Sequence, residues 1–221
     1  MPVTDAPFIR SNLRAQIKDV ILQRILDGDY EPGARLVETR IAQELGVSQA
    51  PVREALRDLE QLGCIVHEPF RGCSVRAFSV DDLLEAFPVR AALEALAARL
   101  AAERISEGEL LQLAELLETM RAAARRGDAH GQSQANASFH ALIVRAARNG
   151  TLERQWSLLE PFSRTFLTVS KSDVDLLALS ERHVPILEAL RARDGEAAAD
   201  AMHRHLMDAA DLLRPMTKEL T

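Results

Sequence analysis

Residues 38–60 limit the fold of this chain more than any other segment. They read as two short helices joined by the tight turn Gly46-Val47-Ser48. Ser48 is a suitable N-cap for the second helix, and Pro51 falls in its first turn, where a missing N–H removes no intrahelical hydrogen bond. This arrangement predicts a helix-turn-helix, a motif whose second helix enters the major groove of DNA.

The second helix of this pair carries polar side chains at every fourth position. Gln49, Arg53 and Arg57 therefore project from one face. Arginine can bind guanine O6 and N7 bidentately, glutamine can bind adenine N6 and N7, and either can bind phosphate. Arg40 in the preceding helix is placed to reach the DNA backbone. The alternative is a solvated face of ordinary charge pairs, because acidic residues are interspersed at Glu54, Asp58 and Glu60.

The flanking segments predict the rest of a winged domain over residues 8–78. They comprise a helix, an extended piece and two strands, at 11–27, 35–37, 64–68 and 73–77. The two strands form the wing, and the loop between them ends in Arg71-Gly72. This pair joins a cation to a residue that allows close approach of the main chain to DNA.

The two cysteines of the chain lie in these strands. In the predicted hairpin Cys73 faces Glu68, which leaves Cys64 about four residues, or roughly 13 Å, away. A disulfide between Cys64 and Cys73 is therefore geometrically unfavourable. Two cysteines cannot build a disulfide framework, so a reducing cytoplasm is the expected compartment.

The composition favours helix over sheet. Ala, Leu, Glu and Arg dominate, and aromatic residues make up 4%. No apolar run approaches the ~20 residues that span a bilayer, and the N-terminus lacks the basic and apolar blocks of a signal peptide. The net charge is −6, but residues 8–78 carry ten basic and ten acidic side chains. DNA binding there requires a local basic face, not a basic protein.

Residues 79–215 predict a second domain, an all-α antiparallel bundle. Ser106 with Glu109 forms a capping box, and Asn149-Gly150 is read as the end of a helix. The other helices are predicted at 79–103, 152–169, 180–193 and 196–213. The expected fold class is therefore mainly α, with a small β wing in the first domain.

The last two predicted helices form a hairpin around Asp194-Gly195. His183 and His205 each lie 11 residues from Asp194, one before it and one after it. At about 1.5 Å per residue both are roughly 16 Å from the turn. The spacing therefore predicts that the two imidazoles lie level with one another, provided that the helical phases agree.

A third imidazole lies earlier in the chain. Asn136 and His140 are four residues apart, so they lie on one helical face. Three imidazoles and a side-chain oxygen can bind Zn²⁺, Ni²⁺ or a similar divalent transition metal. The alternative is a set of polar residues that line a cavity of the bundle without a metal.

Motifs spread over residues 10–78 match a known pattern. They are Gly28…Pro32-Gly33, Leu36…Glu38, Gly46-Val47-Ser48, residues 51–56, Leu59…Gly63 and Arg71-Gly72…Val75. These pieces resemble the winged helix-turn-helix of the GntR family of bacterial transcription regulators. The resemblance implies DNA contacts at Arg40, Arg53, Gly72 and the helix start Ser48-Gln49. The family usually has arginine in place of Gln49, so a different operator is expected.

The second domain contains a further set of motifs. They are Arg90…Leu93-Glu94, Phe139-His140…Asn149 and His183…Asp194…His205-Leu206. They resemble the FCD domain of FadR-type members of the same family, many of which bind a metal through an aspartate and three histidines. The resemblance implies that Asn136, His140, His183 and His205 form this site. Asn136 replaces the aspartate, and an amide oxygen is a weaker ligand than a carboxylate.

The same resemblance implies a pocket for an acidic effector. Arg90 is the first candidate for binding it, and Arg164 is the second. The alternative for Arg90 is an ion pair with Glu94 across one helical turn, which contributes only about 0.2–0.5 kcal/mol where it is exposed.

The expected protein is a homodimeric regulator, most simply a repressor, whose two winged heads bind a pseudo-palindromic operator in double-stranded DNA. Its helical domain binds a small carboxylate at zinc or nickel, and effector and DNA alter each other's affinity. No membrane partner is expected. One alternative is a metal-dependent enzyme that uses the three histidines, although no general base like the Glu of HExxH accompanies them. The other is a metal-free DNA-binding dimer without an effector.

Overall fold

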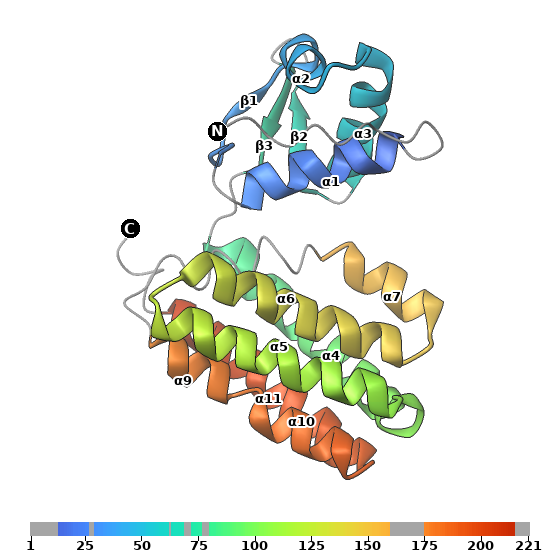
Figure 1. Ribbon diagram of the computed structural model, residues 1–221, viewed down its shortest axis with the longest axis vertical. Helices are drawn as coiled ribbons and strands as arrows, with labels where there is room; N and C mark the ends of the chain where they lie inside the picture. Colours follow the sequence, from blue (N-terminus) through green and yellow to red (C-terminus); the bar gives the residue numbers. More distant parts are fainter. Residues whose placement is uncertain are drawn as a thin grey trace. The chain divides into compact units, whose positions relative to one another are not determined.

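The computed structural model describes residues 13–26, 29–61, 63–68, 72–76, 80–159 and 175–214. The chain divides into two compact units, Met1–Ala77 and Phe78–Thr221 (Figure 1). The predicted fold class is confirmed, because helices dominate and the strands form a small sheet in the first unit. None of the described helices is long and apolar enough to cross a membrane.

Helices α1 to α3 surround the core of the first unit. α1 (Leu13–Leu26) packs against α3 (Gln49–Gln61), and α2 (Glu38–Leu45) precedes α3 in the helix-turn-helix. The turn depends on Gly46, whose φ of 65° lies in the left-handed region that favours glycine. The buried core takes apolar side chains from all three helices, among them Ile17, Ile21, Ile41, Val52 and Leu59.

A three-stranded antiparallel sheet completes this unit. Its strands are β1 (Arg35–Leu36), β2 (Ile65–Glu68) and β3 (Gly72–Val75), in the order β1-β3-β2. The main-chain N–H of Val75 also donates to the carbonyl of Ala34, at 2.9 Å. The wing is therefore tied to the segment that leads into the helix-turn-helix.

The predicted register of the wing is wrong by one residue. Cys73 pairs with His67, and Glu68 pairs with Gly72. Gly72 has a φ of 85° and already belongs to β3, so the connection is one residue shorter than the predicted loop. Cys64 and Cys73 are both free thiols. Burial, together with nearby carboxylates, raises the pKa of the Cys73 thiol to about 11.

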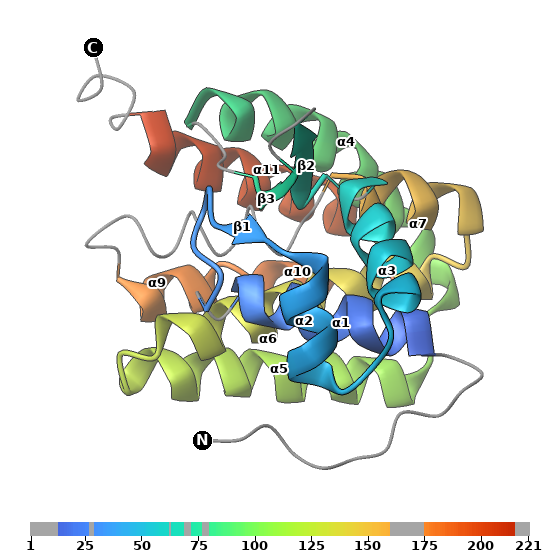
Figure 2. The ribbon, with the colours of Figure 1, turned by 90° about the horizontal axis from the view of Figure 1, so that it is seen from above.

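The second unit is an antiparallel helical bundle. Its described helices are α4 (Val80–Arg104), α5 (Glu107–Arg125), α6 (Ala129–Ala146), α7 (Gly150–Ser157), α9 (Leu176–Glu181), α10 (Val184–Arg191) and α11 (Gly195–Leu213). α4 packs extensively against α11, and α5 against α6, so both pairs lie side by side in Figures 1 and 2. Buried alanines on α4 and α11 permit this close approach. At Gly195 a Cβ would lie 3.1 Å from the main-chain oxygen of Arg99.

The interpretation of Asn149-Gly150 as the end of a helix is wrong. The preceding helix α6 ends at Ala146, and the Asn149 side chain instead accepts a hydrogen bond from a main-chain N–H of α7, at 3.2 Å. Asparagine suits both ends of a helix, so the sequence alone was ambiguous. α7 ends at Ser157, earlier than the predicted helix 152–169, and most of the remaining range lies outside the described residues.

The predicted helix 180–193 is interrupted near its start. α9 ends at Glu181, and α10 begins at Val184 with Pro185 in its first turn. Proline has no N–H to donate to the carbonyl of Glu181, and its ring would clash with that carbonyl in a continuous helix. His183 therefore occupies the N-cap position of α10.

The capping box at the start of α5 is confirmed. The main-chain N–H of Glu109 donates to the Ser106 hydroxyl, and the main-chain N–H of Ser106 donates to the Glu109 carboxylate at 2.9 Å. We expect Ser106→Ala to lower the free energy of unfolding by about 1 kcal/mol, because a helix N–H loses its acceptor. Chemical unfolding followed by circular dichroism measures this change. The control is Ser138→Ala, whose hydroxyl donates only to a carbonyl within α6. An equal loss in both variants would contradict the capping role.

Candidate DNA-binding surface and metal-binding pocket

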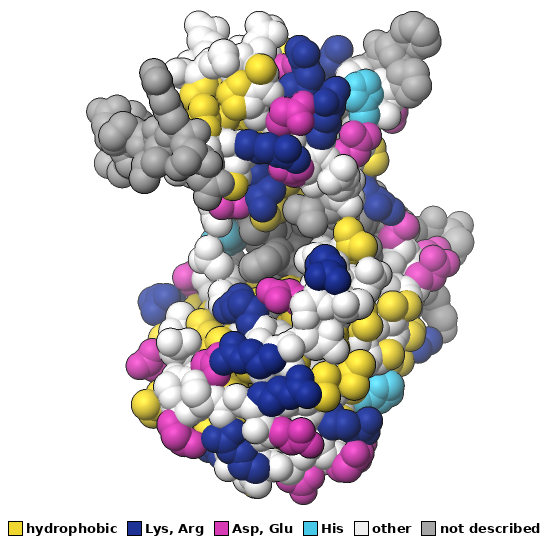
Figure 3. All heavy atoms as spheres, turned by 90° about the vertical axis from the view of Figure 1, so that its right-hand side faces the viewer, with side chains coloured by type: hydrophobic (Ala, Val, Ile, Leu, Met, Phe, Trp, Pro, Cys, Tyr) yellow, Lys and Arg dark blue, Asp and Glu magenta, His cyan; other side chains and the backbone are white. Residues whose placement is uncertain are grey.

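The polar face of α3 is open to solvent in the first unit. Gln49, Arg53 and Arg57 are exposed, and the opposite face of the helix is buried through Val52, Ala55, Leu56 and Leu59. Figure 3 shows Lys and Arg side chains gathered on one face of this unit, with acidic side chains among them. The face of α3 that the sequence predicts to contact DNA is therefore accessible to it.

Three described arginines on this side of α2 and α3 are each paired with a carboxylate of the same unit. The pairs and their N···O distances are Arg53–Glu38 at 3.0 Å, Arg40–Glu44 at 2.8 Å and Arg57–Glu54 at 2.6 Å. Exposed ion pairs of this kind contribute only about 0–1 kcal/mol, so DNA can displace the carboxylates at low cost. The ion pairs on this surface are therefore compatible with the prediction that it binds DNA.

A groove of about 460 Å³ lies between α3 and the wing. Arg53 lines it from α3, and Gly72 lines it from the wing. Arg35 of β1 also lines it, with its guanidinium 3.5 Å from the position that a Cβ on Gly72 would occupy. Arg35 is not among the DNA contacts predicted from the sequence, because nothing in its spacing relates it to the recognition helix. Ser48 is exposed just before α3, and Arg71 lies outside the described residues.

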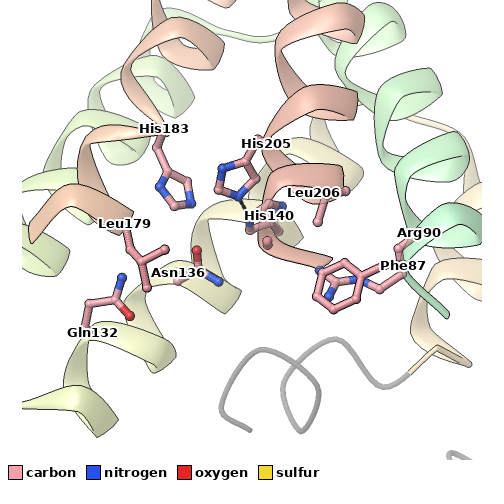
Figure 4. A pocket seen from close by; sticks show the side chains of 10 residues that line it. Phe87, Arg90, Gln132, Asn136, His140, Leu179, His183, His205 and Leu206 are labelled. Atoms are coloured by element: carbon pink, nitrogen blue, oxygen red, sulfur yellow. Dashed lines mark hydrogen bonds between the residues drawn. The ribbon is translucent and has the colours of Figure 1, made fainter. Parts of the chain in front are cut away.

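Three buried histidines from separate elements meet in the second unit. His140 lies on α6, His183 at the start of α10 and His205 on α11. One ring nitrogen of each lies within 4.8 Å of the others, and the Nε2 atoms of His140 and His205 are 3.2 Å apart. Figure 4 shows the three side chains gathered in one pocket. The ring centroids of His183 and His205 are 4.3 Å apart, so the spacing around Asp194 did place these two imidazoles together.

Hydrogen bonds orient two of these rings. The Nδ1 atom of His183 lies 3.1 Å from the main-chain oxygen of Ser180, to which it can donate, and Nδ1 of His140 lies 2.5 Å from Oε2 of Glu94. In each ring this leaves Nε2 as the atom with a lone pair. Burial, with the neighbouring His140, lowers the pKa of His183 to about 3, and burial also lowers the pKa of His205 well below its ordinary value. Neutral imidazoles are the form that binds metals.

The positions of these nitrogens fit a divalent ion. Tetrahedral zinc with Zn–N bonds of about 2.05 Å separates its ligand nitrogens by roughly 3.3 Å, close to the spacing between His140 and His205. The Nε2 atom of His183 is buried and has no hydrogen-bond partner among the described residues, which is unusual unless a ligand or ion satisfies it. Asn136 is buried one turn before His140 and lines the same pocket (Figure 4). The predicted set of four side chains therefore lies together.

Glu94 belongs to this site, although the sequence indicated only an ion pair with Arg90. It is fully buried on α4, and its two oxygens have different partners. Oε1 accepts from Arg90 at 3.0 Å, and Oε2 accepts from His140. Burial alone would raise the pKa of Glu94, but the charge of Arg90 and the interaction with His140 lower it to about 2. Beyond that ion pair, the sequence indicated only that this side chain is buried, because Arg90 and Glu94 follow Phe87 at helical spacing, on the face of α4 that packs into the core.

The pocket extends from the histidines toward an apolar wall. Its cavity volume is about 40 Å³, and its apolar lining residues are Phe87, Leu179, Leu206 and Ala209. Arg90 also lines it, with only 2% of its surface exposed and its guanidinium 5.4 Å from the centre of the Phe87 ring. Its ion pair with Glu94 is therefore buried, unlike the exposed pair considered from the sequence. Arg164, the second effector candidate, lies outside the described residues.

A winged helix-turn-helix in one unit and a histidine-lined pocket in a separate helical unit are the features of a transcription regulator that binds a ligand. Residues 13–75 match the family of bacterial regulatory proteins called gntR, and residues 85–208 match the FCD domain. The chain belongs to the GntR family and carries an FCD domain. It is a DNA-binding transcription regulator, as the sequence predicted. The members of this family are transcription regulators and not enzymes.

Similar proteins align over nearly the whole chain. A probable transcriptional repressor of a D-xylose utilization operon from Paenarthrobacter nicotinovorans is 37% identical over 93% of this chain and 91% of its own length. The transcriptional repressor RspR of Escherichia coli is 29% identical over 92% of this chain and 90% of its own length. The solved structure of E. coli McbR/YncC superposes with a TM-score of 0.79 at 25% identity, covering 93% of this chain and 98% of that one.

Proposed function

We propose that this regulator is a homodimeric repressor of the FadR-type branch, and that a small carboxylate bound at a divalent metal in the FCD domain changes its affinity for a pseudo-palindromic operator. Residues 8–78 act as the DNA-binding domain, and residues 79–215 bind the effector and form the dimer. The observation that carries the proposal is the cluster of three buried histidines, in two of which a hydrogen bond at Nδ1 leaves Nε2 with its lone pair. Two similar proteins named as repressors support the sign of regulation.

The proposed ligands of the metal are His140, His183, His205 and Asn136. Zinc and nickel are the first candidates, because both accept imidazole nitrogen readily. When bound, the ion supplies a Lewis-acidic centre that attracts anionic oxygen atoms. The three histidines hold the ion, and the amide of Asn136 contributes a neutral oxygen donor.

The charges around the pocket favour an anionic effector. The buried charges of Arg90 and Glu94 cancel, and the low pKa values of His183 and His205 keep their imidazoles neutral. A divalent ion would therefore keep both of its positive charges uncompensated by the protein. Because an uncompensated charge is costly away from water, a carboxylate group of the effector stabilises the loaded site. Arg90 also lines the pocket, and we propose Arg90 and Arg164 as direct contacts of the effector.

The cavity volume of about 40 Å³ has room for a metal ion and a few water-sized groups, so we expect a small effector. Since one similar protein is named for D-xylose utilization, the carboxylic acids of five-carbon sugars are the first compounds to test. We expect an effector to lower the affinity for operator DNA in metal-loaded protein and to have little effect on metal-free protein. Fluorescence anisotropy of a labelled operator, with and without each acid, measures this difference. An equal response in both forms would contradict a role for the metal.

We expect untagged full-length protein to hold about one metal ion per protomer. Metal that binds only the folded state stabilises it, by about 2.7 kcal/mol when free metal exceeds its Kd about 100-fold. Elemental analysis measures the metal content, and thermal unfolding before and after chelation measures the stabilisation. Protein that takes up neither zinc nor nickel, even after incubation, would contradict the proposal and favour the metal-free alternative. Sedimentation velocity tests the homodimer separately.

A further inference from the structure

We propose that Glu94 is a positioning residue that selects the tautomer of His140 through one carboxylate oxygen, while Arg90 binds the other oxygen. This inference rests on the proposed metal site, but it concerns the arrangement of protons in the protein before a metal arrives. Nothing in the spacing of the histidines indicates it. It depends on three side chains that lie on α4 and α6 and are each no more than 2% exposed, namely Arg90, Glu94 and His140.

The first step concerns the partners of the carboxylate. Oε1 of Glu94 lies 3.0 Å from Nε of Arg90, and Oε2 lies 2.5 Å from Nδ1 of His140. A guanidinium has donors only, and an ionised carboxylate has acceptors only. The close contact between Oε2 and the ring is therefore a hydrogen bond only if Nδ1 carries an N–H. The form of the ring that can bind a metal carries one N–H, so in that form Nε2 of His140 keeps its lone pair.

The second step concerns the other end of the ring. Nε2 of His140 lies 3.2 Å from Nε2 of His205, where the three candidate ligand nitrogens converge. The opposite tautomer would place a proton at this point and would leave two lone pairs facing one another at Glu94. The contact with Glu94 thus keeps the ligand atom of His140 free of a proton. Outer carboxylates that orient histidines in this way change metal affinity by about 10–100-fold in other proteins.

The third step explains why Arg90 matters. An amide at position 94 would have one accepting end and one donating end, but Arg90, His140 and the indole N–H of Trp156 all face it as donors. Arg90 cannot give up its donors, because a guanidinium is not deprotonated in proteins. The amide oxygen is therefore drawn to Arg90, and the amide NH₂ faces Nδ1 of His140. His140 can accept from this NH₂ only if its proton moves to Nε2.

This reasoning makes Glu94→Gln the decisive variant in full-length protein. We expect its affinity for zinc alone to fall by about 10–100-fold. In metal-free protein we expect ¹⁵N spectra of labelled histidine to show His140 with its proton on Nδ1 in the wild type and on Nε2 in the variant. The signal of His140 is identified by its absence from His140→Gln. Zinc affinity is measured by competition with a chelating dye.

A second variant removes the constraint imposed by Arg90. In R90M/E94Q the amide oxygen is free to face His140, so we expect the Nδ1–H tautomer to return and most of the zinc affinity to be recovered. The methionine side chain fills the space of the arginine stem, and the net charge of the pocket is unchanged because a cation and an anion are removed together. Glu118→Gln, which removes an exposed partner of Arg121, is the matched control and should bind zinc like the wild type.

The tautomer distinguishes this proposal from a simple effect of charge. Glu94→Gln also leaves the charge of Arg90 unpaired, which would weaken zinc binding without moving the proton. A loss of affinity with His140 still protonated on Nδ1 would therefore overturn the proposal. A wild-type spectrum with the proton on Nε2 would overturn it directly, even if the variants did not fold. A wild type that has the expected tautomer but binds no zinc would instead refute the proposed metal site and leave the assignment of Glu94 intact.

Discussion

Replacing His183 with alanine is expected to abolish metal binding. The loss of affinity should exceed the ~10–100-fold that follows from changing a residue that only hydrogen-bonds to a metal ligand. His183 supplies one of three buried imidazoles, and its Nε2 has no other hydrogen-bond partner among the described residues. With two imidazoles left, the weak amide of Asn136 cannot compensate. Elemental analysis and zinc titration measure the loss, and added zinc should no longer raise the melting temperature.

The control for this experiment is His203→Ala. His203 lies on α11 two residues before His205, but it is exposed. It should leave both the metal content and the zinc-dependent stabilisation unchanged. Sedimentation velocity and circular dichroism of both variants show whether folding and assembly are preserved. A His183→Ala protein that keeps its metal would refute the assignment of this residue as a ligand.

The second large effect is expected at the DNA-binding surface. Arg53→Ala should weaken operator binding by about 1–3 kcal/mol if the guanidinium reads a base, with relaxed specificity at that base pair. Within the protein the variant loses the exposed ion pair with Glu38, so the change in folding stability should stay below about 1 kcal/mol. Anisotropy titrations against the operator and against single-base variants measure both the affinity and the specificity.

The outcome on mismatched operators decides between two kinds of contact. An equal loss on all sequences would mark Arg53 as a phosphate contact, with a smaller salt dependence of binding. Lys18→Ala, which removes a cation of α1 in the same unit, is the control and should bind the operator nearly normally. Unchanged binding by Arg53→Ala would remove this residue from the proposed reading face.

Local chemistry explains which parts of the fold were predictable. The helix-turn-helix and the capping box at Ser106 depend on residues within a few positions of one another, and both formed as expected. The predicted strand register of the wing was wrong because the register depends on whether Gly72 belongs to the loop or to the strand. Asn149 was misassigned because the same side chain can cap either end of a helix.

Only part of the metal-binding pocket could be predicted from the sequence. Equal distances from Asp194 were enough to bring His183 and His205 together, even though Pro185 interrupts the helix that the argument assumed. The role of Glu94 could not be derived in the same way. Its spacing from Arg90 indicated an ion pair, but its contact with His140 depends on how α4 packs against α6, which only the tertiary structure fixes.

The carboxylates beside the arginines of the first unit have a consequence for how the regulator finds its operator. A chromosome offers a vast excess of unrelated sites, all with the same phosphate backbone. If Arg53, Arg40 and Arg57 contact DNA as proposed, their partners Glu38, Glu44 and Glu54 would compete with those phosphates at every site, whereas a base contact would add its free energy only at the operator. Such a head would spend less of its time on unrelated DNA than a uniformly basic one, and fewer copies per cell would be needed to occupy one operator.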